Sequence, residues 1–213
     1  MRTSIRSLFG IAAVTAAAAC GATAGTSAGT MDRAARADSV RSSYTQADVD
    51  FMAGMIHHHA QALDMSRLAP THGASASLRI MAERIIVGQN DEIALMQHWL
   101  RERGQAAPEP GGAHMATHGM DHAIHMPGML SAEQMAELDA ARGPEFDRLF
   151  LTYMIQHHQG AITMVEELFR THGGGQGDAV FKLASDIAAD QDSEIARMQS
   201  MLREMMFETE SSP

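Results

Sequence analysis

The chain has 213 residues, enough for one domain with a substantial hydrophobic core. Acidic residues outnumber basic ones, 26 to 16, and the formal net charge is −10, which argues against nucleic acid as a partner. Aromatic residues make up only 5% and prolines number 6, while strong helix formers such as Ala, Leu, Met and Glu are abundant. The composition therefore predicts an all-α protein.

The first 20 residues have the pattern of an export signal: a positively charged start, an apolar stretch over 8–19, and small residues before Cys20. Two processing routes are open. One is cleavage before Cys20 with lipid attached to this residue, as in bacterial lipoproteins, and the other is ordinary cleavage near Ala19 or Ala24. Both predict an exported protein of the periplasm or cell envelope. No later segment has the run of about 18 apolar residues that spans a membrane, so a lipid at Cys20 is the expected membrane contact.

Composition and periodicity divide the mature chain further. The stretch after the signal is small, polar and aperiodic, as in a tether, and a Pro-, Gly-, His- and Met-rich stretch separates two regions with helical periodicity. A short crossover helix is expected within 131–142. The expected segments are a tether (21–44), a first helical hairpin (45–103), a linker (104–130), a second hairpin (131–203) and a C-terminal tail (204–213).

The two periodic regions match each other. The segment DVDFMAGMIHHHAQALDM begins at Asp48 and DRLFLTYMIQHHQGAITM begins at Asp147, and a Thr-His-Gly triplet follows each. Thr45 or Ser43 is expected to cap the first helix. A hairpin cannot bury its apolar stripe alone, so the two copies are expected to pack together. The repeat predicts a four-helix bundle that is ferritin-like in outline.

One face of each matching helix carries histidine and methionine together, when residues are placed at about 100° intervals. His57 points away from this face and Gln156 replaces it in the second copy. The inward residues of the first copy are Asp48, Phe51, Met52, Met55, His58, His59, Ala62 and Met65, and those of the second are Asp147, Phe150, Leu151, Met154, His157, His158, Ala161 and Met164. The partner helices add Gln89, Glu92 and Met96, and Gln191, Glu194 and Met198.

This pattern has two interpretations. A buried His–Glu network could specify how the hairpins pair, with methionine as flexible core filling. Alternatively the residues bind copper, because thioether sulfur is a soft donor for Cu(I) and imidazole binds both oxidation states, which favours Cu(I) over Cu(II). The candidate ligands are Met55, His58, His59, Met65, Met96, Met154, His157, His158, Met164 and Met198, with Glu92 and Glu194 as further candidates. Asp48 and Asp147 are expected either to orient a histidine or to serve as caps.

The linker is a separate candidate. Short tracts rich in histidine often bind metal, and a flexible tract could capture ions and pass them inward, although a plain solvated loop is the alternative. The candidate ligands in the linker are His114, Met115, His118, Met120, His122, His125 and Met126.

Two further histidines are not candidates. His72 and His172 lie before a glycine at a helix end, where a structural role is expected.

The paired Met-Ile-x-His-His segments, each with Ala and Met downstream, resemble domain-of-unknown-function family 305 over roughly 45–202. The copper-binding CopM proteins of the bacterial periplasm belong to this family. The resemblance implies a ferritin-like helical bundle, a location outside the cytoplasm and copper binding through Met and His. By matching position it supports Met55, His58, His59 and Met65, and likewise Met154, His157, His158 and Met164.

The leading hypothesis is a protein that sequesters or carries copper ions and so contributes to copper homeostasis or resistance. It either lowers free copper in the envelope or delivers copper to another copper-handling envelope protein, and the sequence leaves both open. It is not expected to be an enzyme. The alternative of a ferritin-like metal-dependent oxidase lacks the Glu-x-x-His spacing of di-iron bundles, and no hydrolase motif is present. A further alternative is a helical scaffold or interaction module without metal.

Overall fold

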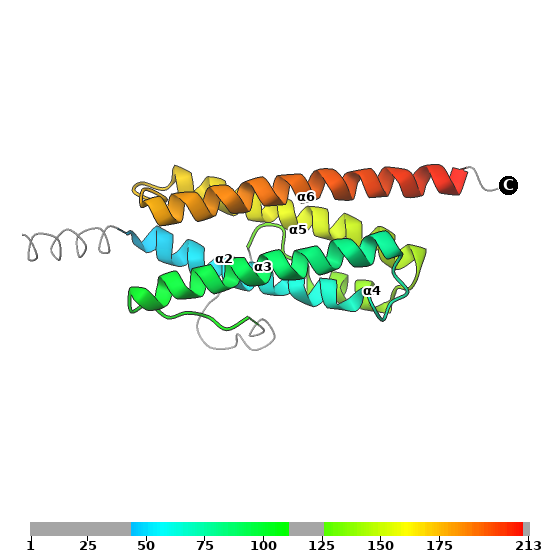
Figure 1. Cartoon of the computed structure of the whole chain (residues 1–213), viewed down its shortest axis with the longest axis horizontal. Coiled ribbons are helices and arrows are strands. Elements are labelled where there is room, and N and C mark those ends of the chain that lie inside the picture. Colours follow the sequence, from blue (N-terminus) through cyan, green and yellow to red (C-terminus); the bar gives the residue numbers. More distant parts are fainter. Residues whose placement is uncertain (1–43, 111–125, 211–213) are drawn as a thin grey trace, which may run out of the picture. The chain divides into compact units, whose positions relative to one another are not determined.

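The computed structural model describes residues 44–110 and 126–210. These ranges contain five helices and no strand, so the predicted all-α class is confirmed (Figure 1). None of these helices has an apolar stretch long enough to cross a membrane. The predicted export signal, the predicted tether up to residue 43 and linker residues 111–125 lie outside the described residues. The helices are α2 (Gln46–Leu68), α3 (Ala76–Glu102), α4 (Ala132–Ala140), α5 (Pro144–Arg170) and α6 (Asp178–Glu210).

The helices begin where the sequence supplies caps. Thr45 caps α2 as predicted: its hydroxyl accepts from the Asp48 N–H, and the Asp48 carboxylate accepts from the Thr45 N–H at 2.8 Å. Ser131 and Gln134 form the same capping box at α4, which is the predicted crossover helix. Pro144 begins α5, where its missing N–H costs nothing.

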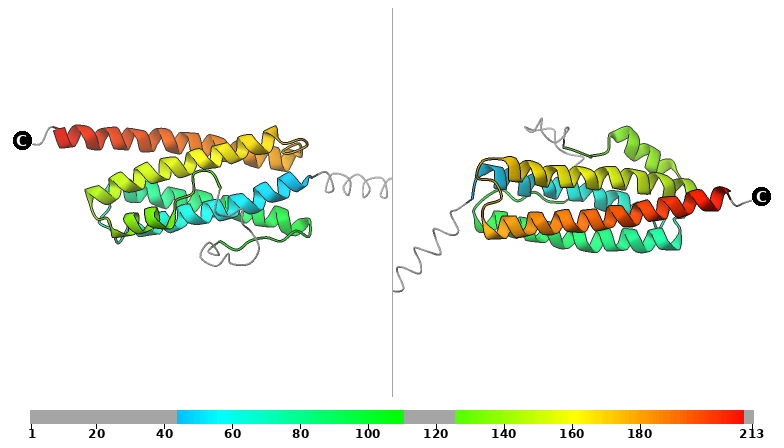
Figure 2. Two further views of the ribbon diagram at one scale, coloured as in Figure 1. Left: turned by 180° about the vertical axis from the view of Figure 1, so that it is seen from behind. Right: turned by 90° about the horizontal axis from the view of Figure 1, so that it is seen from above.

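The long helices pack in two pairs. α2 lies along α3 and α5 along α6, while α2 also contacts α5, and α4 lies against α2 and α5 (Figures 1 and 2). Two carboxylates connect the pairs reciprocally. Asp48 of α2 accepts from the Gly175 N–H at 2.7 Å in the α5–α6 loop, and Asp147 of α5 accepts from the Ser75 N–H at 3.1 Å in the α2–α3 loop. Each aspartate therefore fastens the loop of the other helix pair, and Asp48 also caps its own helix.

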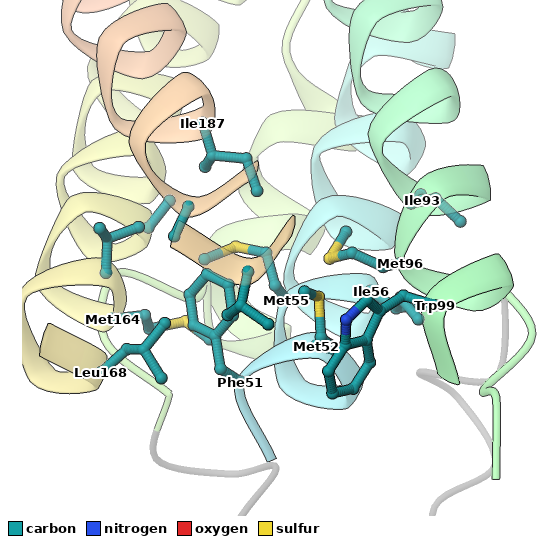
Figure 3. Close-up of a cluster of buried hydrophobic side chains, with 14 of the residues drawn as sticks. Phe51, Met52, Met55, Ile56, Ile93, Met96, Trp99, Met164, Leu168 and Ile187 are labelled. Atoms are coloured by element: carbon teal, nitrogen blue, oxygen red, sulfur yellow. The ribbon is translucent and has the colours of Figure 1, made fainter. Parts of the chain in front are cut away.

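The buried apolar residues form two clusters, and Figure 3 shows the one that contains Trp99. The Trp99 cluster joins residues within 49–63, 93–100, 161–168 and 180–187, and the Phe146 cluster joins residues within 62–85, 130–154 and 195–198. On α3, Gln89 lies between the two clusters, and on α5 the same place is taken by His157 and His158. A polar layer thus separates two apolar regions within one bundle.

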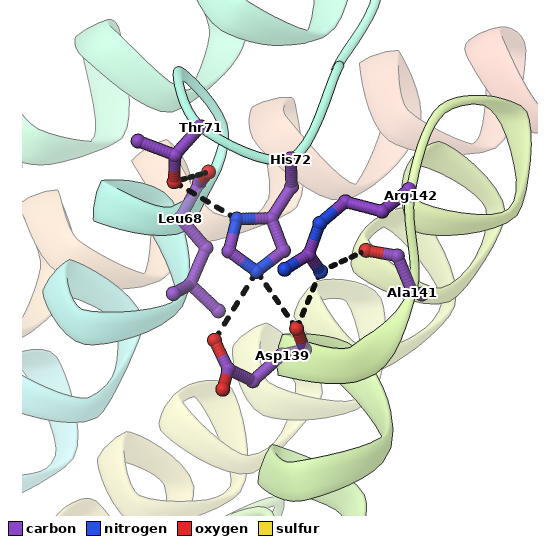
Figure 4. Close-up of polar contacts among 6 residues, drawn as sticks. All are labelled: Leu68, Thr71, His72, Asp139, Ala141 and Arg142. Atoms are coloured by element: carbon purple, nitrogen blue, oxygen red, sulfur yellow. Dashed lines mark hydrogen bonds and ion pairs between the residues drawn. The ribbon is translucent and has the colours of Figure 1, made fainter.

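The two Thr-His-Gly triplets have different surroundings. The buried His72 ring donates from Nε2 to the Asp139 backbone carbonyl at 2.9 Å and accepts at Nδ1 from Thr71 at 2.9 Å (Figure 4). His172, in contrast, is exposed. His72 therefore has a structural role, because it connects the α2–α3 loop to the end of α4. His172 has no equivalent contact, because no helix corresponding to α4 follows α5 in the second copy.

The C-terminal boundary differs from the prediction. A tail was expected over 204–213, but α6 continues to Glu210. Met201, Leu202 and Met205 pack against the Phe146 cluster, so the apolar stripe of α6 extends beyond Met198. This continued packing, which the polar residues nearby obscure in the sequence, keeps the last turns helical.

Candidate metal centre

Four histidines form the centre of the polar layer. His58 and His59 on α2 and His157 and His158 on α5 all have 0% exposure, and we name these four side chains the histidine layer. The His58 and His157 rings face each other across the α2–α5 contact, with their centroids 3.8 Å apart. The ring centroids of sequence neighbours lie farther apart, at 6.4 Å for His58 and His59 and at 6.2 Å for His157 and His158. The inward face predicted for both helices is confirmed.

Three of these rings are held through Nε2. His59 pairs with the Glu92 carboxylate at 2.8 Å, and His158 pairs with the Glu194 carboxylate at 2.7 Å. His58 donates to the backbone carbonyl oxygen of Pro127 at 3.0 Å. Carbonyl and carboxylate oxygens only accept, so the proton of each neutral ring lies on Nε2 and the lone pair lies on Nδ1. The two glutamates thus orient histidines through the ring nitrogen remote from the lone pair.

The lone pairs have no protein partner. The Nδ1 atoms of His58, His59 and His158 and both nitrogens of His157 are buried without a hydrogen bond of standard geometry. Each such atom costs about 1–3 kcal/mol in a metal-free fold. An imidazole whose N–H is anchored to a carboxylate or carbonyl while its other nitrogen is free has the arrangement of a metal-ligating histidine. The donor set therefore fits a metal ion.

Burial also keeps two of the four rings neutral, those of His58 and His157. It lowers the pKa of His58 to about 3, with the neighbouring His59 acting in the same direction and the Pro127 contact opposing it. Burial likewise lowers the pKa of His157 well below its ordinary value, assisted by His58 and the other two histidines. A neutral imidazole is the form that binds metal, so these two rings need not lose a proton near neutral pH.

The six bundle methionines predicted as ligands are all buried, and the structure divides them into two groups. Each group draws two residues from one sequence copy and one from the other. Met55, Met96 and Met164 lie in the Trp99 cluster, together with Met52 (Figure 3), and Met65, Met154 and Met198 lie in the Phe146 cluster. The predicted thioethers thus flank the histidine layer on both sides.

Nitrogen and carboxylate groups alone do not complete a site. Within 44–110 and 126–210, no three His, Cys, Asp or Glu side chains are placed to hold one metal ion. A site at the histidine layer therefore requires a further donor, and the flanking methionine sulfurs are soft donors of the kind that select Cu(I). The linker candidates His114, Met115, His118, Met120, His122 and His125 lie outside the described residues, whereas Met126 packs against the Trp99 cluster.

Sequence reasoning missed the segment that crosses the layer. Residues 126–130, which we name the crossing segment, provide the Pro127 carbonyl for His58. The segment is fastened to α2 by Gln61, whose amide donates to the Leu130 carbonyl at 3.0 Å and accepts from its N–H at 2.8 Å. On α5, a Cβ added to Gly160 would lie 2.0 Å from the Pro127 oxygen. The sequence did contain one indication of this close contact. The second copy has a glycine, Gly160, within a predicted helix at the position where the first copy has Gln61.

Comparisons with known proteins agree with this architecture. The family described as "Domain of unknown function (DUF305)" matches residues 48–205. A DUF305 fragment from Deinococcus radiodurans is 30% identical, with a TM-score of 0.62 over 75% of this chain and 97% of that chain. CopM in its Cu(II)-bound form is 28% identical, with a TM-score of 0.58 over 74% of this chain and 96% of that one. CopM in its Cu(I)-bound form is also 28% identical, with a TM-score of 0.56 over 76% and 97%. Among curated proteins nothing matches significantly. The chain belongs to the DUF305 family.

Proposed function

We propose that this protein binds copper ions through the histidine layer and the flanking methionines, and that it sequesters or carries copper rather than catalysing a reaction. The observation that carries the proposal is the set of buried, unpartnered Nδ1 atoms on rings whose Nε2 atoms are already anchored. A network that only specified packing would use both nitrogens of each ring. Rings oriented on one side and free on the other are prepared for a ligand.

Copper is favoured over other metals by the donor types. The imidazoles lie between two groups of buried thioethers, and thioether sulfur prefers Cu(I) to hard divalent ions. CopM, a structural relative of 28% identity, is known in Cu(I)-bound and Cu(II)-bound forms. We infer that Cu(I) is the preferred ion here and that Cu(II) binds through the imidazoles.

The finer architecture and the location belong to the same proposal. The paired ties Asp48–Gly175 and Asp147–Ser75 support two repeated hairpins in a ferritin-like four-helix bundle. The export signal supports a periplasmic or envelope protein, with or without a lipid at Cys20. Such a protein would keep free copper low outside the cytoplasm or deliver it to another copper-handling protein.

The test is an anaerobic Cu(I) titration of the purified, metal-free protein against a competing chelator. The test variant carries His58→Leu and His157→Leu, because leucine fills the volume of imidazole without leaving an unpaired nitrogen. The control variant carries His98→Leu and His172→Leu, which remove two exposed histidines of the described region. Circular dichroism on all three proteins verifies that the helices remain.

The proposal expects tight Cu(I) uptake by the native protein and the control, and loss of at least one copper equivalent in the test variant. Changing Glu92→Gln should weaken the same site by about 10–100-fold, since the carboxylate orients His59. If the folded test variant binds as much copper as the control, the histidine layer is not the site. If the native protein does not compete with the chelator, the copper function itself is wrong.

A further inference from the structure

Most sides of the histidine layer are closed to solvent. Along the bundle axis, the Trp99 cluster covers one side of the layer and the Phe146 cluster covers the other. Over the α2–α5 face lies the crossing segment, which holds His58 through the Pro127 carbonyl. The segment leaves no room for an ion beneath it, because a Cβ added to Gly160 of α5 would lie 2.0 Å from the Pro127 oxygen. The opposite face of the bundle is formed by α3 and α6.

A cleft of about 220 Å³ opens on this opposite face, and we name it the α3–α6 cleft. The contacts of the bundle run mainly within the α2–α3 and α5–α6 pairs and between α2 and α5, so α3 and α6 are loosely joined. Helix α4 lies on the other side of the bundle (Figure 2). The lining of the cleft includes Arg84, Gly88 and Glu92 of α3 and Asp190, Ser193 and Glu194 of α6.

Two glutamates connect this cleft with the histidine layer. Glu92 and Glu194 both line the cleft, and their side chains are 13% and 23% exposed. The same carboxylates contact the fully buried rings of His59 and His158 at 2.8 and 2.7 Å. One carboxylate thus separates each of these rings from the cleft. Rotation of a glutamate side chain, which is fast compared with the opening of a helix pair, is enough to bring an ion from the cleft to an imidazole.

The cleft attracts cations without retaining them. Glu92, Asp190 and Glu194 contribute three carboxylates, against the guanidinium of Arg84. A cleft lined by one sign of charge raises the local concentration of ions of the opposite sign. Within 44–110 and 126–210, however, no three His, Cys, Asp or Glu side chains are placed to hold one metal ion. Attraction that is strong enough for entry but too weak to trap the ion is the property that a conduction path requires.

We propose that copper ions enter and leave the histidine layer through the α3–α6 cleft, past Glu92 and Glu194. This inference rests on the proposed copper function and deepens it, because it assigns the path between solvent and the buried imidazoles. Asp190 and the two glutamates draw the ion into the cleft, and the glutamates then give way to it. The cleft therefore sets the rate of copper exchange, whereas the histidines and methionines set the affinity.

The experiment mixes the full metal-free chain with aqueous Cu(II) in a stopped-flow instrument and follows the absorbance of imidazole-bound Cu(II). The phase that is missing from the protein with His58→Leu and His157→Leu reports the histidine layer. Gly88→Phe places a ring in the cleft, since a Cβ added to Gly88 meets no atom within 4 Å. Ala94→Phe is the matched control, because it adds the same ring to an exposed residue of α3 that does not line the cleft.

Two further variants strengthen the test. Ser193→Phe narrows the cleft from α6, so the test does not depend on the folding of one variant, and circular dichroism verifies the helices of each. Asp190→Asn removes a charge from the cleft. Asp178→Asn is its control, because it makes the same change on an exposed residue of α6 about 18 Å away along the helix at about 1.5 Å per residue.

Gly88→Phe and Ser193→Phe should each slow both association and dissociation of copper by about 10-fold or more, because passage then waits for local opening of the bundle. The Kd should stay the same, since a path shared by entry and exit changes both rates equally. Ala94→Phe should leave both rates unchanged. At about 0.1 M salt, Asp190→Asn should lower the association rate by about threefold and Asp178→Asn by less, and about 1 M salt should abolish the difference.

Several results would overturn this route. One is unchanged copper exchange in folded Gly88→Phe and Ser193→Phe proteins, and another is equal slowing by Gly88→Phe and Ala94→Phe. Slower exchange together with a weaker Kd in both cleft variants would indicate a damaged site instead of a blocked path. Failure of the copper function itself is distinguishable, because the native protein would then lack any phase that His58→Leu and His157→Leu remove.

Discussion

Gly160 of α5 meets the crossing segment backbone to backbone, and an alanine there has no room. The added Cβ would lie 2.0 Å from the Pro127 oxygen, 2.4 Å from the Pro127 carbonyl carbon and 2.6 Å from the Gly128 Cα. Real Cβ atoms do not approach backbone this closely, so Gly160→Ala must displace the crossing segment or bend α5. Displacement separates the Pro127 carbonyl from His58.

The magnitude follows from the contacts that would be lost. The His58 N–H would be left buried without an acceptor, at about 1–3 kcal/mol. The two hydrogen bonds between Gln61 and Leu130 would weaken, at about 0.5–1.5 kcal/mol each. Alanine is the better helix former by about 1 kcal/mol, which partly offsets these losses. We expect the free energy of unfolding to fall by about 2–4 kcal/mol.

The assay is urea denaturation followed by circular dichroism, with Gly88→Ala as the matched control. Gly88 lies in the middle of α3, and a Cβ added there meets no atom within 4 Å. Gly88→Ala should therefore raise the free energy of unfolding by up to about 1 kcal/mol. Opposite signs for the two substitutions are the expected result. If Gly160→Ala is as stable as the native protein or more stable, the crossing segment does not lie against α5 as described.

Further predictions concern stability and pH. Replacing His72 with Ala should cost about 2–4 kcal/mol in chemical denaturation, because a buried ring and its contact to the end of α4 are lost, whereas His172→Ala should change stability by less than about 0.5 kcal/mol. Acid should destabilise the metal-free protein: the buried His58 and His157 resist protonation in the fold but not in the unfolded chain, so stability is lost as pH falls below about 6.5. In denaturation at pH 7, 6 and 5, the free energy of unfolding should fall by about 1 kcal/mol per pH unit for each histidine. The double variant with His58→Leu and His157→Leu should lose less stability over the same range. An equal dependence of the free energy of unfolding on pH in both proteins would contradict this. Thr45→Ala should lower stability by about 1 kcal/mol through loss of the α2 cap, which thermal unfolding monitored by circular dichroism can measure.

The sequence predicts the bundle's inward faces well because helical periodicity is a local property. Every residue assigned to the inward face of the two histidine helices is buried, including the carboxylates of Asp48 and Asp147. The α2 cap at Thr45 and the crossover helix follow from short capping patterns that involve only neighbouring residues. These features require no knowledge of which helix packs on which.

The partners of the polar groups could not be predicted in the same way. The Pro127 carbonyl is 69 residues from His58 in sequence and belongs to a proline- and glycine-containing segment that resembles an ordinary loop. His72 and His172 share the same triplet, but only His72 meets the end of α4. Long-range contacts decide each of these cases.

The unpartnered nitrogens distinguish a binding site from a structural network. If the histidine layer existed to specify pairing of the hairpins, its hydrogen bonds should be complete, and replacing His58 and His157 by leucine should destabilise the fold. Instead, neither ring nitrogen of His157 and only one of His58 makes a hydrogen bond of standard geometry, between two apolar clusters where an unpaired polar atom is most costly. Leucine at both positions should therefore stabilise the metal-free protein while removing the metal site. In the native protein, binding of an ion would offset the destabilisation caused by the unpaired nitrogens, because a ligand that binds only the folded state stabilises it. Substitutions in the layer should therefore change the affinity for metal and the stability of the metal-free protein in opposite directions.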